Sequence, residues 1–225
     1  MANALPADTS RDSEPIRLFK SGFLEFFTHI SPVTIVVVWV PVIGYLLYVA
    51  IRSAVSPPFP GYIPVGVVLG LFLWTVAEYL LHRFLFHYHA RTPAAEKIFF
   101  LFHGIHHAQP QDKTRLVMPL PVSIPLAVIF YALFYAVVGV LLKAPLWVDP
   151  LMGGFIIGYL IYDLTHYATH HFPMRAGYAK YIKRYHMMHH YKDAATRFGV
   201  SSPVWDWVFG TQGTDEKAEP AAGSA

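Results

Sequence analysis

The sequence contains no cysteine, which excludes disulfide bonds, cysteine-ligated zinc and iron–sulfur clusters. Charged residues are also scarce, at 14% of the chain against about 25% in a typical soluble domain. The formal net charge of +3 is too small to indicate a nucleic-acid partner, and no nucleic-acid recognition motif is found. Hydrophobic residues make up 55% of the chain instead. This composition indicates a membrane protein whose metal ligands, if it has any, supply nitrogen or oxygen.

Four apolar stretches approach the roughly 20 residues that a helix needs to cross a bilayer. They run over about residues 32–51, 63–81, 119–142 and 146–165. Pro57, Pro58 and Pro60 break the chain within the first helical hairpin, and a short turn at 143–145 lies within the second. The length of 225 residues favours one domain, so we expect an all-α integral membrane protein. Its expected parts are a polar N-terminal segment (1–30), a membrane domain (31–210) and a disordered tail (211–225).

Basic residues are distributed unevenly between the two sides that these spans define. Of the 17 lysines and arginines, only Arg52 and Lys143 fall in the connections within the hairpins. Short loops rich in Lys and Arg stay on the cytoplasmic side of a membrane. We therefore expect both termini and the 82–118 loop to be cytoplasmic.

All but one of the 13 histidines lie in two short stretches, both at the expected cytoplasmic ends of spans. The exception is His29, for which we expect a packed or interfacial position. The first stretch holds His82, His87, His89, His103, His106 and His107, and the second holds His166, His170, His171, His186, His189 and His190. Neutral imidazole is a common transition-metal ligand. The histidines therefore predict a metal site with several ions at a membrane surface, acting on a lipid-soluble substrate.

The histidine spacing favours convergence on one helix face at most positions. Residues three or four apart share a face, as His166 and His170 do. His82 and His87 are five apart, about 140° around an ideal helix, and converge only if the helix bends or if they face different ions. About ten imidazoles exceed the ligand number of one ion, so we expect two ions with about five ligands each. Ligand type alone does not choose between Fe, Zn, Cu and Ni.

Acidic and basic residues beside the histidines suggest supporting roles. Glu78 and Asp163 lie in apolar spans, where an unpaired carboxylate is costly. Each is predicted to accept the ring N–H of a ligating histidine, or alternatively to pair with Arg83 or a lysine. Lys113 and Arg115 lie where a lipid head group would sit, and either bind that head group or are ordinary cytoplasmic charge.

The chain resembles the membrane fatty acid hydroxylase superfamily, which includes sterol desaturases, and within it the fatty acid 2-hydroxylases. The segments that carry this resemblance are Glu78–His87, His103–His107, Asp112–Pro119, Gly158–Tyr167, His186–His190, Phe198–Ser201 and Trp205–Asp206. The resemblance implies four transmembrane helices under a cytosolic helical cap that encloses a dimetal centre. It implies ligation by His82, His87, His103, His106, His107, His166, His170, His186, His189 and His190. His89 and His171 are not required by the family pattern.

The same resemblance implies a di-iron oxygenase that hydroxylates C2 of a long acyl chain with O2, although zinc also occupies such sites. Eukaryotic members often carry a b5-type cytochrome domain, for which this sequence has no room. We therefore expect a separate electron donor, such as a b5-type cytochrome, a ferredoxin or a reductase. We expect a bacterial inner membrane as the location, or the ER membrane if the chain is eukaryotic. The Trp205–Trp207 segment is expected to be an amphipathic anchor without chemistry.

Three other functions remain open at this point. The same centre could hydroxylate another lipid: a carotenoid, a sterol or an aminolipid head group. A membrane zinc hydrolase acting on an amide lipid would use the same ligand type. A metal transporter is disfavoured, because its ligands normally lie near the middle of the bilayer and these lie at span ends.

Overall fold

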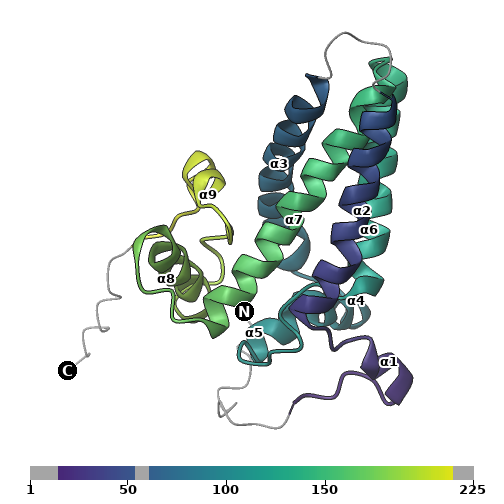
Figure 1. The fold of residues 1–225 in the computed structure, drawn as a ribbon. Coiled ribbons are helices and arrows are strands. Elements are labelled where there is room, and N and C mark those ends of the chain that lie inside the picture. Colours follow the sequence, from purple (N-terminus) through teal and green to yellow (C-terminus); the bar gives the residue numbers. More distant parts are fainter. Residues whose placement is uncertain (1–14, 54–60, 215–225) are drawn as a thin grey trace, which may run out of the picture.

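The computed structural model describes residues 15–53 and 61–214, and the regular structure in these ranges is entirely helical (Figure 1). The membrane helices are α2 (Pro32–Ser53), α3 (Tyr62–Leu80), α6 (Leu120–Phe134) and α7 (Val148–His171). The shorter helices are α1 (Gly22–Phe26), α4 (Pro93–Phe99), α5 (Ile105–Ala108), α8 (Gly177–Tyr191) and α9 (Val204–Phe209). Three π-helical stretches, η1 (Leu81–Phe86), η2 (Phe100–Gly104) and η3 (Tyr135–Leu141), and the 3₁₀ turn η4 (Pro145–Trp147) complete the described elements.

The four expected spans are present as helices long and apolar enough to cross a membrane. They run over Pro32–Ser53, Tyr62–Phe86, Leu120–Leu141 and Pro145–His171. The second and fourth extend five and six residues beyond the expected ends at 81 and 165. The extension arises because the helical backbone continues through the histidines instead of stopping at the first of them. The division into three domains stays a prediction, and residues 1–14 of its first part and 215–225 of its last part lie outside the described residues.

Helix α7 is the central helix of the bundle. In Figure 1 it runs between α3 and α2, with α6 at the periphery. In the most apolar stretches of these helices, 67% of α7 is buried inside the protein but only 6% of α6. Trp74 of α3 packs edge-on against Phe155 and Tyr159 of α7. The span carrying His166 is therefore held on the span carrying His82.

Glycines allow α3 and α7 to approach closely. A Cβ atom on Gly70 would lie 1.9 Å from the carbonyl oxygen of Leu151, and one on Gly154 would lie 2.0 Å from that of Val67. Small residues at membrane helix interfaces permit such backbone contact. At one end of this pair, α5, α8 and α9 form a cap beside the histidine-bearing ends (Figure 1).

Candidate metal centre

The ten histidines expected as ligands form two groups of five. In each group, one ring nitrogen from every member lies within 4.8 Å of the others. The first group is His82, His87, His103, His107 and His189, and the second is His106, His166, His170, His186 and His190. The groups adjoin, since the rings of His107 and His190 stack with centroids 4.2 Å apart.

Within both groups the Nε2 atoms point toward one another. In the first, Nε2 of His82 lies 3.1 Å from that of His103 and 3.2 Å from that of His87. In the second, Nε2 of His106 lies 2.8 Å from that of His166 and 2.9 Å from that of His190. Each group therefore encloses a small volume faced by imidazole nitrogen.

The two groups do not correspond to the two histidine stretches of the sequence. The 103–107 segment gives His103 and His107 to the first group and His106 to the second. Helix α8 likewise gives His189 to the first group and His186 and His190 to the second. The two candidate ion positions are consequently built on shared helices.

The π-helical stretch η1 explains how His82 and His87 come to face the same position. In η1 the backbone N–H of His87 donates to the carbonyl oxygen of His82, five residues earlier, at 3.2 Å. This i→i+5 pairing inserts an extra residue into the turn and brings residues five apart onto one face. Of the two explanations considered for the five-residue spacing of His82 and His87, a distorted helix therefore applies. The two histidines need not face different ions.

Backbone carbonyls orient two of the histidines in the first group. Nδ1 of His82 contacts the carbonyl oxygen of Phe198, and Nδ1 of His189 lies 2.6 Å from that of Thr196. A carbonyl only accepts, so each Nδ1 carries the proton and each Nε2 is left with a lone pair. Because Nε2 atoms with lone pairs cannot hydrogen-bond one another, a cation between them satisfies this arrangement. The donor set therefore fits bound metal ions.

Six of the expected ligands that lie outside the membrane spans are held in the neutral form. Burial, reinforced by neighbouring histidines, lowers the pKa of His103, His106, His107 and His186 well below the ordinary value. Burial also lowers the pKa of His87 to about 3 and that of His189 to about 4. Neutral imidazole is the ligating form, so these rings are prepared for metal binding at neutral pH.

Glu78 contacts other groups than the sequence predicted. Its carboxylate accepts the backbone N–H groups of Val200 and Ser201, both at 2.7 Å, and the Ser201 hydroxyl. The predicted hydrogen bond to a histidine ring is corrected accordingly: Glu78 holds the 198–201 segment, and the Phe198 carbonyl of that segment orients His82. The support for the histidine passes through the backbone.

Asp163, like Glu78, contacts a backbone N–H group and not the predicted histidine ring. Both of its carboxylate oxygens face the backbone N–H of Met118, at 3.0 and 3.2 Å, and the prediction that it contacts a histidine ring is corrected too. Asp163 thus fastens the chain that enters α6 to the middle of α7.

Asp206 supports the centre as well, although only an anchoring role was expected for its segment. This carboxylate is fully buried and accepts the N–H groups of Phe198 and Gly199 at 2.9 and 2.8 Å. It therefore holds the same segment as Glu78. An acid between two tryptophans, in a chain so poor in charge, was the available signal.

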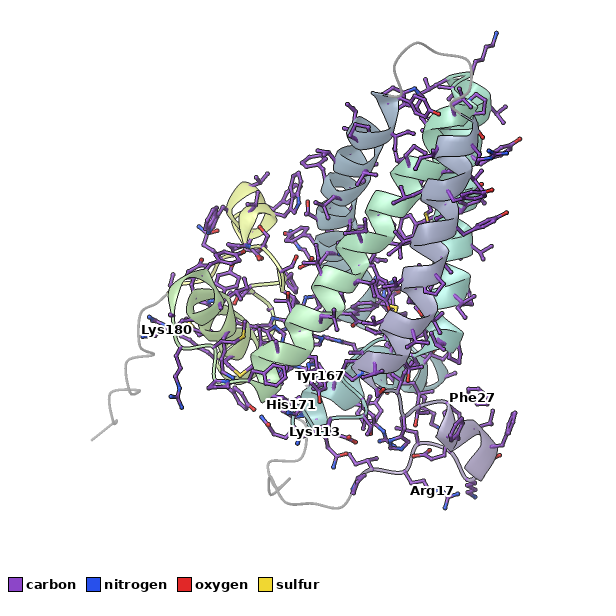
Figure 2. The ribbon with its side chains drawn as sticks, in the orientation of Figure 1. Arg17, Phe27, Lys113, Tyr167, His171 and Lys180 are labelled. Atoms are coloured by element: carbon purple, nitrogen blue, oxygen red, sulfur yellow. The ribbon has the colours of Figure 1, made fainter. Side chains whose placement is uncertain are left out.

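The remaining histidines lie outside both groups. His89 is exposed, and His171 is half-buried at the end of α7, near Lys113 and Tyr167 (Figure 2). His29 contacts Thr114 and Arg115, at 2.6 and 2.9 Å, which agrees with its expected packed position.

A largely apolar cavity of about 520 Å³ opens beside the histidines. His103 of the first group and His106 and His166 of the second form part of its wall. The rest is mostly apolar and comes from η2, the chain entering α6 and the N-terminal segment around α1. An apolar ligand in this cavity lies against both histidine groups at once.

Arg115 also lines this cavity, but its guanidinium is already engaged. It lies 2.5 Å from the Glu25 carboxylate, donates to the Ile16 carbonyl and is 2.9 Å from Nε2 of His29. Arg115 thus fastens the N-terminal segment, and the head-group role considered for it stays a prediction. Lys113 does not line the cavity and lies toward His171, so a head-group role for it stays a prediction.

Comparison with known proteins gives a consistent set of relatives. The sequence model of a family described as fatty acid hydroxylase matches residues 67–211. A dihydroceramide fatty acyl 2-hydroxylase of Arabidopsis thaliana is 37% identical over 87% of this chain and 79% of its own length. A ceramide very long chain fatty acid hydroxylase of Schizosaccharomyces pombe is 42% identical over 85% of this chain, but this match spans only 54% of the yeast protein.

Two further similarities extend this set. The fatty acid 2-hydroxylase of Rattus norvegicus is 34% identical over 92% of this chain and 59% of its own length. A solved structure of full-length scs7p, in which only the hydroxylase domain is visible, superposes with a TM-score of 0.76 and 37% identity. That match covers 84% of this chain and 69% of the other.

Proposed function

This chain belongs to the fatty acid hydroxylase family, and we propose that it hydroxylates C2 of a long acyl chain in a membrane lipid. The family and its relatives make it an integral membrane oxidoreductase with a metal centre and a need for O2. The printed names of the relatives from A. thaliana and R. norvegicus both specify 2-hydroxylation. One observation carries the proposal for this chain: a single apolar cavity touches histidines of both groups.

We propose that each histidine group holds one iron ion. The fit rests on the convergence of five imidazoles in each group and on the lone pairs that the backbone carbonyls direct inward. Zinc suits the same ligands but has no redox chemistry. When bound, the iron pair supplies the activation of O2 that an unactivated C–H bond requires.

The chain itself binds and positions the substrate. Apolar side chains such as Phe86, Leu101 and Val117 line the cavity and suit an acyl chain, which they shield from water. His103, His106 and His166 mark where the reacting carbon must lie, since only there does the cavity meet the histidines. The wall thereby selects one carbon of the chain by position, as proximity catalysis requires. In the overall reaction one oxygen atom of O2 enters the lipid and the other leaves as water, which consumes two electrons and two protons.

We propose that these electrons arrive from a donor protein at the cytoplasmic face. The candidate donors are a b5-type cytochrome, a ferredoxin and a reductase. The positive-inside distribution of lysine and arginine supports a cytoplasmic location of the histidine groups. A bacterial inner membrane is the proposed location.

The test is lipid mass spectrometry on cells that express the wild type or His106→Ala, grown under ordinary or isotopically heavy O2. We expect a lipid that gains one oxygen atom in the wild type only, with the heavy isotope incorporated and with fragmentation that places the hydroxyl at C2. His89→Ala is the matched control, because this exposed histidine belongs to neither group. Release of free fatty acid that depends on His106 but not on O2 would instead establish a zinc hydrolase.

A further inference from the structure

The wall of the cavity opposite the histidines is built by the N-terminal segment, residues 16–30. Leu18, Phe19, Phe23, Leu24 and Phe27 of this segment line the cavity. Figure 1 shows α1 on the far side of α4 and α5 from α8, which carries His186, His189 and His190. In Figure 2, Phe27 and His171 lie well apart across the same end of the molecule. A chain with its reacting carbon at the histidines extends toward α1.

One ion pair holds this wall in place. The Arg115 side chain is 2% exposed and that of Glu25 is 15% exposed, with 2.5 Å between guanidinium and carboxylate. The other carboxylate oxygen of Glu25 accepts the backbone N–H groups of Leu18 and Phe19, at 3.0 and 2.8 Å. Glu25 thereby holds both α1, to which it belongs, and the segment around Leu18 and Phe19 that precedes this helix.

Further hydrogen bonds attach both ends of the segment to the 109–115 loop. The N–H of Ile16 donates to the side-chain oxygen of Gln109, and the N–H of Ile30 donates to the Thr114 carbonyl, at 2.9 and 2.8 Å. His29 adds its contact with the Thr114 hydroxyl at 2.6 Å. A segment anchored at both ends is a wall of fixed position, not a loose tail.

Two neighbouring phenylalanines on this segment face different surroundings. Phe27 lines the cavity, whereas Phe26 is not among its lining residues and is 72% exposed. Their rings meet edge to face with centroids 5.5 Å apart. Phe26 and Phe27 therefore provide a matched comparison, because they are the same residue type at adjacent positions and only Phe27 lines the cavity.

We propose that the N-terminal segment selects the length of the acyl chain, with Leu24 and Phe27 as the residues that contact its distal end. This inference rests on the proposed function, because it takes the acyl chain as the occupant of the cavity. Glu25 and Arg115 are positioning residues that keep Leu24 and Phe27 in place. A methylene group that leaves water for this wall favours binding about fourfold, so a change in wall depth alters selectivity measurably.

The test is competition among saturated fatty acids of long and very long chain length, supplied as a mixture to cells expressing each variant. Phe27→Ala deepens the cavity and is expected to raise the ratio of longer to shorter hydroxylated product about fourfold for each methylene accommodated. Phe27→Trp is expected to shift the ratio the opposite way. Phe26→Ala should leave the wild-type ratio unchanged. Equal ratios for both alanine variants and the wild type would overturn the proposal.

A binding measurement separates failure of this proposal from failure of the proposed function. The purified protein is loaded with the fluorescent fatty acid cis-parinaric acid, which is then displaced by saturated fatty acids of long and very long chain length. The concentration of each fatty acid that displaces the probe reports chain-length preference without turnover. A shift with Phe27→Ala but not Phe26→Ala supports the wall even where no hydroxylated lipid forms. Glu25→Gln is expected to flatten the chain-length preference, while total binding of the probe is kept. Unchanged preference in all variants contradicts the assignment.

Discussion

At the scale of single residues, the candidate centre depends on carboxylates that touch no histidine. Glu78 and Asp206 together fasten the 198–201 segment. The Phe198 carbonyl at the start of that segment orients the His82 ring. Without Glu78 or Asp206 the Phe198 carbonyl is no longer held in place. The His82 ring then loses the contact that directs its Nε2 toward the other histidines.

Asp206→Asn is therefore expected to weaken metal binding about 10- to 100-fold, the usual cost of losing an outer partner of a ligand. The asparagine keeps the size of the side chain but loses one of the two oxygens that accept from Phe198 and Gly199. Metal content after dialysis against graded chelators measures the change. Asp149→Asn, at an aspartate that accepts the Tyr131 hydroxyl, is the control and should retain metal as the wild type does.

Glu25 gives a prediction about pH. Burial raises the pKa of its carboxyl, but the backbone N–H groups of Phe19 and Leu18 and the Arg115 charge outweigh burial and hold the pKa below 4.5. A lowered pKa stabilises the folded protein above pH 4.5, and this contribution is lost as pH falls through the folded pKa.

Glu25→Gln should consequently cost about 1–3 kcal/mol near neutral pH, because a buried guanidinium loses its partner. The difference in stability between the variant and the wild type should shrink as the pH falls from neutral to below 4.5. Melting temperatures of both proteins, measured from neutral to acidic pH, test this prediction. Exposed Glu96 supplies the control, Glu96→Gln, and an acid-independent difference for Glu25→Gln would contradict the sign of the argument.

At the scale of elements, the sequence predicted which segments form helices but not how their backbones deviate from the α-helix. Hydropathy identifies the span that ends near His82, yet it carries no signal for the π-helical geometry of Leu81–Phe86. Spacing likewise predicted about ten ligands, and the family resemblance implied which histidines they are. Spacing did not predict their partition into two groups, because that partition depends on how α8 packs against the 103–107 segment.

Deletion of Leu85 tests the role of η1. Removing one residue is expected to restore ordinary α-helix geometry, in which His82 and His87 are four positions apart and still share a face. The first group then keeps its five ligands, so the variant should retain two ions per chain, because η1 only accommodates the extra residue. Leu85→Ala keeps the residue count and should also retain both ions. Loss of metal in the deletion variant but not in Leu85→Ala would show that the π-helical geometry itself is required.

At the scale of the whole molecule, charge distribution predicts an orientation that the fold makes testable. The spans, the helical class and the gathering of histidines at one end followed from hydropathy and spacing. The N-terminal segment was expected only to be polar, since local sequence does not reveal that Glu25 meets Arg115, 90 residues away. Contacts between distant segments are what the sequence alone could not supply.

Single cysteines report the orientation cleanly, because the natural chain has none. Arg52→Cys, on the exposed end of α2, should react with a membrane-impermeant maleimide in intact cells. Arg91→Cys, exposed near the histidines, should react only after the membrane is opened. The reverse labelling pattern would place the histidine groups on the outer face.

The backbone contact between α3 and α7 has a consequence for the lipid environment. Gly70 and Gly154 bring these helices together directly, while α6 offers most of its surface outward. A thicker or thinner bilayer is accommodated by helix tilt, at a cost of fractions of a kcal/mol for each ångström of mismatch. The loosely packed α6 absorbs that tilt more readily than two helices in backbone contact. The spacing between His82 and His166 is thus insulated from membrane thickness, and this enzyme should keep its metal in lipids of widely different chain length.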